Sequence, residues 1–473
     1  MTGRAEVHKF STSCLRDAGS LRSAAALVTA ASESASVVVV VSALEGTSAT
    51  LAEAAQAAAT GNRERGLQLL AAVLDRHETV LSELGGPAER DTRAELNAIV
   101  GELRDLVRGA VLVGELTPRT RDRILAAGEK MSARLFAVCL AEAGIRPSVR
   151  DADEFLETDN SFGAATVISD VAGRTISSVL RATLESGGAP VVTGHIGRAP
   201  DGATTTLGKG GSDLTATLIA AALRADEVTI WTVAEGVYTA APDLEPNARV
   251  IDHLNYREAA ELSYYGIDAL HLSSILPIRK LGVPIRIRNS ADPSKPGTLV
   301  TGRFTAGPSP VKGVAAARGQ CLVSVESSGV EPATRIVHRV VGALDVAGAR
   351  VTMISQSSSE ASICLAVPTE QARTAETALK REFRHELTRG FIDDISVRRH
   401  TALVAAIGLG MRDTPGVAAR LFAALGSRGV NVIACAQGSS QFNVTIAVDE
   451  DDVAEAVQGI HRDFGLHETG RAR

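Results

Sequence analysis

Hydrophobic positions along the chain alternate between short apolar runs and longer stretches with helical spacing. Residues 7–10 and 37–41 are predicted to be buried strands, and the second is a continuous β-branched run, which is typical of a parallel strand covered on both faces. Residues 20–31 between them are helix-like, and residues 51–143 are mostly helical. Further short strands are predicted at residues 190–193, 227–232 and 283–287, with helical stretches between them. This alternation predicts a layered α/β domain.

A change of composition near Asn289 predicts a domain boundary. The segments 292–297 and 307–310 are rich in Pro, Gly and Ser. Beyond them, residues 354–367 align without gaps to residues 435–448, which predicts two copies of a small α+β unit. Two copies are too few for a solenoid, so a paired module is expected. The polar turns inside the repeats fit either hairpin turns or a pocket for a small ligand.

Composition and charge narrow the class of protein. The chain has 473 residues, of which 45% are apolar and only 3% aromatic, so its cores must consist of Ala, Val, Leu and Ile. The net charge of −6 argues against a general nucleic-acid binder. The N-terminus has no apolar signal region, and the longest apolar run near it is too short to span a bilayer. We therefore expect a cytoplasmic protein with no nucleic-acid or membrane partner.

The cysteines show no spacing that suggests a disulfide framework or a metal site. No Cys-x-x-Cys pair occurs, and no cysteine lies near a histidine at metal-ligand spacing. We therefore expect free thiols in a reducing compartment and assign no metal-binding residue. The five cysteines are Cys14, Cys139, Cys321, Cys364 and Cys435.

The segment that carries the clearest chemical signal is the glycine-rich turn at residues 205–213, directly before an apolar helix pattern. Its glycines allow a tight turn and close approach of a ligand. Ser212 or Asp213 is expected to cap the helix, whose free N–H groups attract anions, and Lys209 adds a positive charge. Lys209 is followed by Gly210, so the turn is not a Walker A loop. The turn indicates anion binding, although a purely structural turn fits the same residues.

Several segments together resemble the aspartokinases of the amino-acid kinase family. They occur in the family's order and cover nearly the whole chain, and the C-terminal repeats resemble the family's two ACT domains, most closely at residues 410–417. The matching segments are Lys9-Phe10, Ser42-Ala43, Gly128 to Ser132, Thr206 to Asp213, Trp231-Thr232, Glu235 to Thr239, Glu258 to Leu262 and Pro296 to Leu299.

The resemblance implies a fold class and a domain order. It implies a three-layer α/β/α amino-acid kinase domain with a mostly parallel sheet at residues 1–300, and a linker at 301–312. Two ferredoxin-like α+β ACT domains would follow, at residues 313–392 and 393–473. The implied activity is phosphorylation of the β-carboxylate of aspartate, or of a closely related amino acid, by ATP with Mg²⁺. The ACT pair implies an amino-acid effector and a homodimer or higher homo-oligomer.

The resemblance also assigns roles to individual residues. Lys9 would stabilise charge on the transferring phosphoryl group, Asp213 would orient Lys9, and Glu129 would accept the ammonium of the substrate. The other substrate-binding residues implied are Ser42, Ser48, Lys209 and Ser212. Those implied for the nucleotide are Ser11, Gly210, Gly211, Thr232, Glu235, Gly236 and Tyr238. Those implied for the effector are Ile354, Gln356, Ser358, Glu360, Asn431 and Gln437.

The departures from the family pattern are concentrated among phosphate-binding residues. Ser11 and Thr12 replace two glycines, and their side chains would crowd the phosphate or require a positive φ. Asp243 replaces an arginine and Asp268 a lysine, and each swap changes the local charge by two units. Lys209 also replaces a substrate-binding arginine.

Three hypotheses remain open. The protein is an aspartokinase-type enzyme with modified nucleotide binding, a redirected enzyme with another acceptor or donor, or a non-catalytic pseudokinase that regulates a partner.

Overall fold

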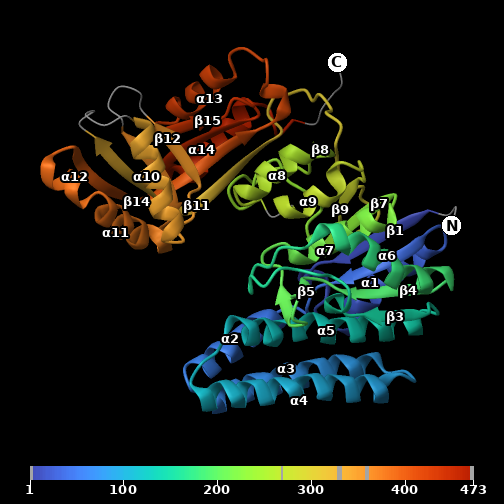
Figure 1. Cartoon of the computed structure of the whole chain (residues 1–473). Helices are drawn as coiled ribbons and strands as arrows, with labels where there is room; N and C mark the ends of the chain where they lie inside the picture. Colours follow the sequence, from blue (N-terminus) through green and yellow to red (C-terminus); the bar gives the residue numbers. More distant parts are fainter. Residues whose placement is uncertain (1–3, 268–269, 328–332, 357–361, 469–473) are drawn as a thin grey trace. The chain divides into compact units, whose positions relative to one another are not determined.

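The computed structural model describes residues 4–267, 270–327, 333–356 and 362–468, and the chain forms two compact units (Figure 1). The first unit consists of Met1–Val237, Asp252–Tyr256 and Ala269–Arg303. The second unit consists of Tyr238–Ile251, Arg257–Asp268 and Phe304–Arg473. None of the helices that the structure describes has the length and apolar character needed to cross a bilayer.

The first unit is built on an eight-stranded sheet. Its strands are β1 (Ala5–Phe10), β2 (Ser36–Val41), β3 (Pro147–Arg150), β4 (Ala189–Thr193), β7 (Glu227–Thr232), β8 (His253–Asn255), β9 (Ile285–Asn289) and β10 (Thr298–Thr301). They lie in the order β3-β4-β2-β1-β7-β9-β10-β8. All neighbours pair in parallel except β9 and β10. The predicted mostly parallel sheet is thereby confirmed.

The helices of the first unit are α1 (Ala18–Ser32), α2 (Thr47–Ala59), α3 (Arg63–Leu84), α4 (Glu89–Val113), α5 (Pro118–Glu142), α6 (Ser169–Glu185), α7 (Gly211–Leu223) and α9 (Leu272–Arg279). Apart from its first residue, α8 (Tyr256–Tyr264) belongs to the second unit. Helices α1 and α5 pack on one face and α6 and α7 on the other, which gives the expected three layers (Figure 1). The valines of β2 are at most 2% exposed because both of their faces are covered.

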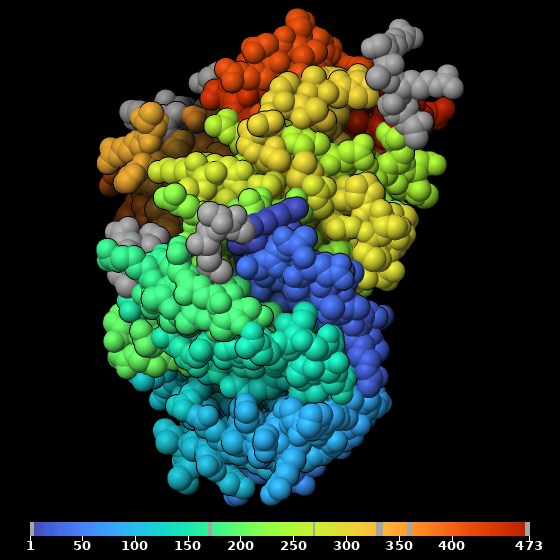
Figure 2. All heavy atoms as spheres, turned by 90° about the vertical axis from the view of Figure 1, so that its right-hand side faces the viewer, coloured from blue at the N-terminus to red at the C-terminus, as the bar shows by residue number. Residues whose placement is uncertain are grey.

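The long helices α3 and α4 add a further helical layer. They pack against each other and against α2 and α5, outside the layer that touches the sheet (Figure 1). In the space-filling view their light-blue atoms form one end of the first unit (Figure 2). A separate hairpin of β5 (Ile196–Arg198) and β6 (Thr204–Thr206) leads into α7.

The second unit is built on a six-stranded antiparallel sheet. Its strands are β11 (Gly313–Ser327), β12 (Met353–Gln356), β13 (Ile363–Pro368), β14 (Ile392–Ile407), β15 (Ala434–Gln437) and β16 (Asn443–Asp449). Its helices are α10 (Ala333–Val346), α11 (Ala372–Glu382), α12 (Arg384–Arg389), α13 (Val417–Gly426) and α14 (Val453–Asp463). The predicted repeats are confirmed as two equivalent hairpins, β12–β13 and β15–β16.

Short 3-10 helices lie in the connections of both units. They are η1 (Thr12–Cys14), η2 (Ala152–Glu154), η3 (Thr369–Gln371), η4 (Leu409–Met411) and η5 (Glu450–Asp452).

Two long strands, β11 and β14, pass through both halves of the second sheet. Residues 320–325 of β11 pair with β13, and residues 401–407 of β14 pair with β16. The start of β11, residues 313–317, pairs with residues 403–407 and so adds a strand to the half that contains the second repeat. Each half therefore has four strands in ferredoxin-like order and its own hydrophobic core.

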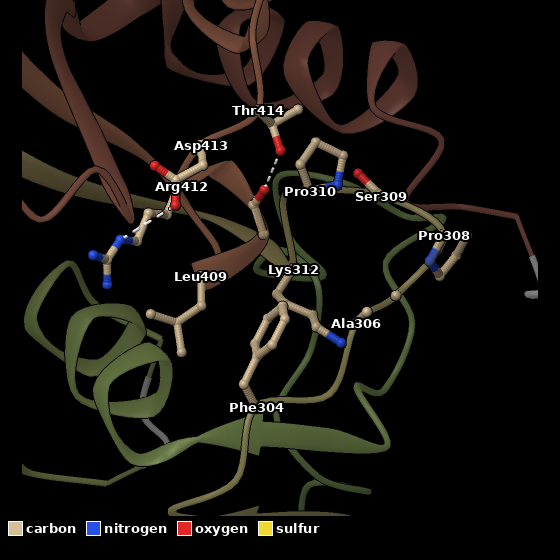
Figure 3. A pocket seen from close by; sticks show the side chains of 12 residues that line it. Phe304, Ala306, Pro308, Ser309, Pro310, Lys312, Leu409, Arg412, Asp413 and Thr414 are labelled. Atoms are coloured by element: carbon tan, nitrogen blue, oxygen red, sulfur yellow. Dashed lines mark hydrogen bonds and ion pairs between the residues drawn. The ribbon is translucent and has the colours of Figure 1, made fainter.

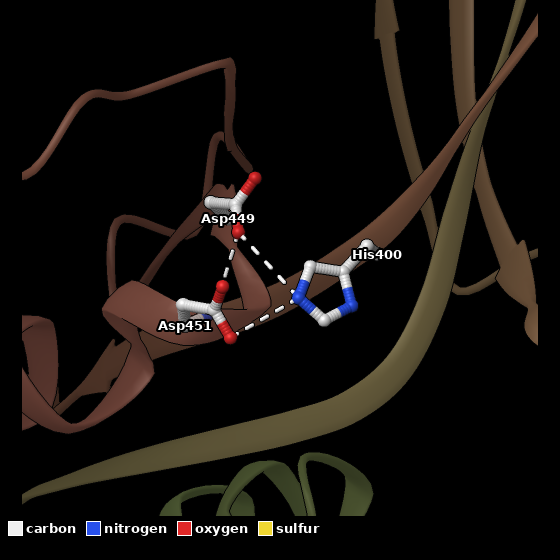
Figure 4. Close-up of side chains that lie close together, drawn as sticks. All are labelled: His400, Asp449 and Asp451. Atoms are coloured by element: carbon white, nitrogen blue, oxygen red, sulfur yellow. Dashed lines mark hydrogen bonds and ion pairs between the residues drawn. The ribbon is translucent and has the colours of Figure 1, made fainter.

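The two long strands are irregular where the halves meet. β11 shifts its register between Ala317 and Gln320, and His400 on β14 adopts a left-handed φ of 60°. The His400 ring lies 3.1 Å from the Asp451 carboxylate and 3.9 Å from that of Asp449 (Figure 4). Asp451 raises the pKa of His400. His400 and Asp451 are exposed, so these ion pairs contribute little to stability.

The aromatic contact beneath the first sheet gives a test of this core. Phe136 on α5 is fully buried, and its ring centre lies 5.2 Å from that of Phe10. Phe136→Ala should lower the free energy of unfolding by about 3–5 kcal/mol. Urea unfolding followed by the fluorescence of Trp231, the single tryptophan, measures it in this unit. Leu112→Ala is the control, because Leu112 is 88% exposed. Equal losses in both variants would contradict this core.

Candidate functional site

The carboxyl ends of four adjacent parallel strands, β4, β2, β1 and β7, meet at one edge of the first sheet. The residues that follow three of these strands are Ser11, Ser42 and Gly194. The backbone N–H of each donates a hydrogen bond to a carbonyl at the end of the neighbouring strand. Ligands of open α/β sheets bind outside this edge. Two residues predicted from the sequence, Ser11 and Ser42, therefore lie side by side there.

Lys9 is a buried ammonium group at the end of β1. It is 7% exposed, its Nζ lies 2.7 Å from Asp213 Oδ1, and it donates a hydrogen bond of 2.9 Å to Ser11 Oγ. Asp213 lies in the first turn of α7. The contact to Ser11 is a hydrogen bond and the contact to Asp213 is an ion pair, so Lys9, Asp213 and Ser11 form one cluster. An ammonium group has three donors, so these contacts do not exhaust the donors of Lys9.

The start of α7 differs from the expected cap. Gly210, with a φ of 76°, occupies the N-cap, and neither Ser212 nor Asp213 caps the helix with its side chain. The carboxylate of Asp213 is instead engaged with Lys9. The first N–H groups of the helix therefore lack the predicted side-chain acceptor.

Packing explains two of the glycines in this turn. A Cβ on Gly210 would lie 2.3 Å from His271 Cβ, and a Cβ on Gly211 would lie 2.5 Å from His195 Nδ1. A Cβ on Gly194 would likewise lie 2.7 Å from Ser212 Oγ. Close packing alone therefore explains why Gly210 and Gly211 are glycines. The contact with Gly194 also shows that Ser212 packs closely against the sheet edge.

The backbone after β1 corrects one expectation about the missing glycines. Ser11 has an extended conformation with a φ of −71°, and a 3-10 turn over Thr12–Cys14 follows. Neither Ser11 nor Thr12 is among the described residues with positive φ. Of the two alternatives expected for these side chains, the positive φ is therefore excluded, and crowding of the phosphate stays a prediction.

Glu129 on α5 is a buried carboxyl group. It is 5% exposed, and its Oε2 has no hydrogen-bond partner among the described residues. Burial raises its pKa to about 8, against the opposing effect of backbone hydrogen bonds, including one from Ala43. Ala43 follows Ser42, so Glu129 faces the loop after β2. Its free oxygen has lost water without gaining a donor among the described residues, which disfavours the charged form.

Two buried hydroxyl groups near Glu129 were not predicted. Thr47 is 2% exposed and Ser132 fully buried, and neither hydroxyl has a partner among the described residues. A Cβ on Gly128 would lie 3.4 Å from Thr47 Cγ2, so Thr47 packs on α5. Ser132 lies one turn after Gly128 and Glu129, on the same side of the helix. Ser132 was part of the motif that carried the resemblance, whereas the predicted Ser48 is exposed.

The other residues predicted to bind the substrate or the nucleotide do not form a cluster like that of Lys9. Lys209 is exposed, and Thr232 ends β7, where its carbonyl accepts from Ser290 N. Gly236 is buried, and Glu235 forms an ion pair with Lys295.

Two residues of the nucleotide argument, Tyr238 and Asp243, belong to the second unit. Tyr238 belongs to the second unit, where it forms a bridge with Val250. Asp243 is exposed in the second unit. Asp268 lies outside the described residues.

Three of the predicted effector residues lie on the edge strands of the second sheet. Ile354 and Gln356 belong to β12, and Gln437 ends β15. Ser355 Oγ donates to the Cys435 carbonyl at 3.0 Å, so these two edge strands approach each other. Asn431 is exposed before β15. Ser358 and Glu360 lie outside the described residues.

The second unit also contains a cleft of about 620 Å³ (Figure 3). It lies between the segment before β11 and the turn that contains η4. No predicted site residue lines it, although part of its lining comes from residues 410–417, which carried the resemblance. Its lining includes Phe304, Pro308, Lys312, Leu409 and Arg412. The five cysteines are free, as expected, although Cys364 and Cys435 are only partly buried.

Comparisons with known proteins identify families for both parts of the chain. The model of the amino acid kinase family matches residues 5–289, and an ACT domain model matches residues 323–383 and 404–464. The bifunctional aspartokinase/homoserine dehydrogenase 1 of Arabidopsis thaliana is 32% identical over 98% of the chain and 51% of its own length. The chain thus spans about half of this relative.

Two solved structures are similar over nearly their whole length. E. coli aspartokinase III in complex with aspartate and ADP has a TM-score of 0.83 at 28% identity. The coverage is 98% of this chain and 100% of that chain. The same enzyme with lysine and aspartate has a TM-score of 0.76 at 28% identity, over 97% and 99% of the two chains.

The buried carboxyl group of Glu129 predicts a pH dependence of stability. With a folded pKa of about 8 and an ordinary value of 4.5, the folded state holds a proton between these values that the unfolded state has lost. The stabilisation is therefore complete below pH 4.5 and is lost as the pH rises towards 8, by about 1.4 kcal/mol per pH unit. Glu129→Gln should remove this slope in urea unfolding between pH 5 and 8. Parallel pH profiles for both proteins would disprove the assignment.

Proposed function

The chain belongs to the amino acid kinase family, as an aspartokinase with C-terminal ACT domains, and from this we propose that it transfers the γ-phosphoryl group of ATP to the β-carboxylate of aspartate or a closely related amino acid. The observation that carries the proposal is the cluster of Lys9, Asp213 and Ser11 at the sheet edge, beside the start of α7. The similar E. coli structure holds aspartate and ADP, which supports both substrate classes.

The residues at this edge suit phosphoryl transfer. The reaction has a loose transition state with charge spread over the phosphoryl oxygens, so the protein mainly positions groups and neutralises charge. The Lys9 ammonium group and the N–H groups at the start of α7 supply fixed positive charge. Mg²⁺, when bound, neutralises further phosphate charge. The carboxylate oxygen of the acceptor bonds to the phosphorus as the bond to ADP breaks, and no proton needs to be removed.

Glu129 suits the ammonium group of the acceptor. Its free oxygen is buried, and an ammonium placed there would stabilise the carboxylate form and lower its pKa. Ser42, Ser48, Ser212 and Lys209 are proposed to bind the acceptor's remaining polar groups. Only Ser42 and Ser212 among these are held at the sheet edge, and Ser48 and Lys209 are exposed.

We also infer that the second unit binds a small amino acid and joins copies of the chain. The edge strands β12 and β15 bring Ile354, Gln356 and Gln437 to neighbouring edges of the sheet. The similar E. coli enzyme was crystallised with lysine in its T-state, which supports an amino-acid effector. Val341 and Val346 on α10 are 41% and 81% exposed, which supports α10 as part of a homo-oligomer contact.

The transferase activity is tested by trapping the acyl phosphate. Purified protein with MgATP, aspartate and hydroxylamine should give aspartyl hydroxamate. Lys9→Met should lower kcat by at least about a hundredfold, because it removes a preorganised charge. Lys280→Met is the matched control, because Lys280 is an exposed lysine of the same unit and should leave kcat unchanged.

Other outcomes separate the remaining hypotheses. Calorimetric ATP binding with turnover only on another acid would identify a redirected enzyme. Absence of both hydroxamate and ATP binding would leave a non-catalytic role and reject the proposed reaction.

The effector proposal predicts a thermal shift. At least one proteinogenic amino acid should raise the melting temperature, since a ligand at a hundred times its Kd adds about 2.7 kcal/mol. Gln437→Ala should remove the shift, while Gln68→Ala, an exposed residue of the first unit, should keep it. If none of the twenty amino acids changes the melting temperature, the effector proposal is wrong.

A further inference from the structure

Asp122 on α5 is a buried carboxylate to which the proposed reaction assigns no role. It is 1% exposed. Its Oδ2 accepts hydrogen bonds from Gly163 N and Thr206 N, each at 2.8 Å. Its Oδ1 accepts from Thr206 Oγ1 at 2.9 Å. Thr206 ends β6 and leads directly into the glycine-rich turn, so Asp122 fixes the entry of that turn.

The same turn is held from its other side by His195. The His195 carbonyl accepts from Leu207 N at 2.9 Å, and its ring forms a hydrogen bond to the backbone of Gly208. His195 adopts a left-handed φ of 69°, which is uncommon outside glycine and is maintained here by these contacts. Gly208 also packs on Gly163, since a Cβ there would lie 3.3 Å from the Gly163 carbonyl oxygen. The segment around Gly163, which is hydrogen-bonded to Asp122, therefore also packs against the glycine-rich turn.

The contacts to Asp122 and His195 matter because the backbone of the glycine-rich turn could otherwise adopt several conformations. Three of its positions are glycines, which lack the Cβ that normally restricts the backbone. The N–H groups at the start of α7 depend on the conformation of this turn. Without the contacts to Asp122 and His195, their direction would be set only by the glycines.

Helix α5 also carries Glu129, seven residues after Asp122. Seven residues are nearly two helical turns, so both side chains lie on one side of α5, about 10 Å apart along its axis. One end of this stretch bonds to the glycine-rich turn, and the other presents the carboxyl group for the acceptor's ammonium. The helix therefore sets the spacing between the two proposed ligand-binding groups.

We propose that Asp122 is a positioning residue that fixes the glycine-rich turn relative to Glu129 through helix α5, and so aligns the phosphoryl donor with the amino-acid acceptor. The kinetic part of this inference rests on the proposed function. Correct alignment of two substrates greatly increases the reaction rate, and a misplacement of about 1 Å lowers the rate on the order of a hundredfold.

The test compares Asp122 variants with a control on the same helix. Asp122→Ala should lower kcat/KM for hydroxamate formation on the order of a hundredfold. It should also raise the hydrogen-exchange rates of the Gly163 and Thr206 amides at least tenfold. Asp122→Asn should recover most of the activity, because its amide oxygen still accepts both backbone N–H groups. Thr117→Ala removes the N-cap bond to Thr120 N, so it should lower the melting temperature while keeping kcat/KM.

The outcomes separate this inference from the proposed function. If Asp122→Ala keeps wild-type kcat/KM, or if Thr117→Ala loses as much activity at an equal loss of melting temperature, the inference is wrong. If the wild-type protein forms no hydroxamate and binds no ADP by calorimetry, the proposed function fails. Amide exchange then decides, and unchanged exchange at Gly163 and Thr206 in Asp122→Ala overturns the restraint. If Asp122→Ala does not fold, Thr206→Val can replace it, because it removes only the hydrogen bond from the Thr206 hydroxyl to Asp122. It should lower kcat/KM and amide protection in the same direction by a smaller factor.

Discussion

The buried ion pair between Lys9 and Asp213 is the interaction on which the arrangement of the first unit's sheet edge depends. The two side chains are only 8% and 16% exposed, so both charges are largely removed from water. Removing one partner of such a pair typically costs 3–5 kcal/mol, because the other charge stays buried. The pair therefore locks the end of β1 to the first turn of α7. Ser11 completes the arrangement without exhausting the donors of Lys9.

Glu129 is a buried ionisable group that differs from Lys9 in its partners. Lys9 has its counter-ion, whereas one oxygen of Glu129 has no donor among the described residues, and burial raises its pKa. Such a group lowers the stability of the empty protein as the pH rises. A positively charged ligand would remove this cost on binding. The first unit thus combines a cation that has a counter-ion, Lys9, with an acid that lacks one, Glu129. In the proposed reaction, Lys9 serves the phosphoryl donor and Glu129 the amino-acid acceptor.

The second unit has a different organising constraint, which is the continuity of two strands. β11 and β14 hydrogen-bond within both halves of one sheet, so a displacement in one half has a direct path into the other. The edge strands β12 and β15 touch through Ser355 and the Cys435 carbonyl. An effector at these edges would contact both halves at once. It could change their equilibrium only through a difference in affinity between two arrangements.

The sequence alone determined the features that a few neighbouring residues encode. The valine run predicted β2, the repeat predicted both hairpins, and the family resemblance implied that Asp213 orients Lys9. Tertiary structure decided what depends on distant segments. Gly210 occupies the N-cap while Asp213 pairs with Lys9, residues 313–317 join the sheet half that carries the second repeat, and Asp122 accepts hydrogen bonds from Thr206. Periodicity reports which face of a segment is buried, but not which distant backbone or charge will meet it there.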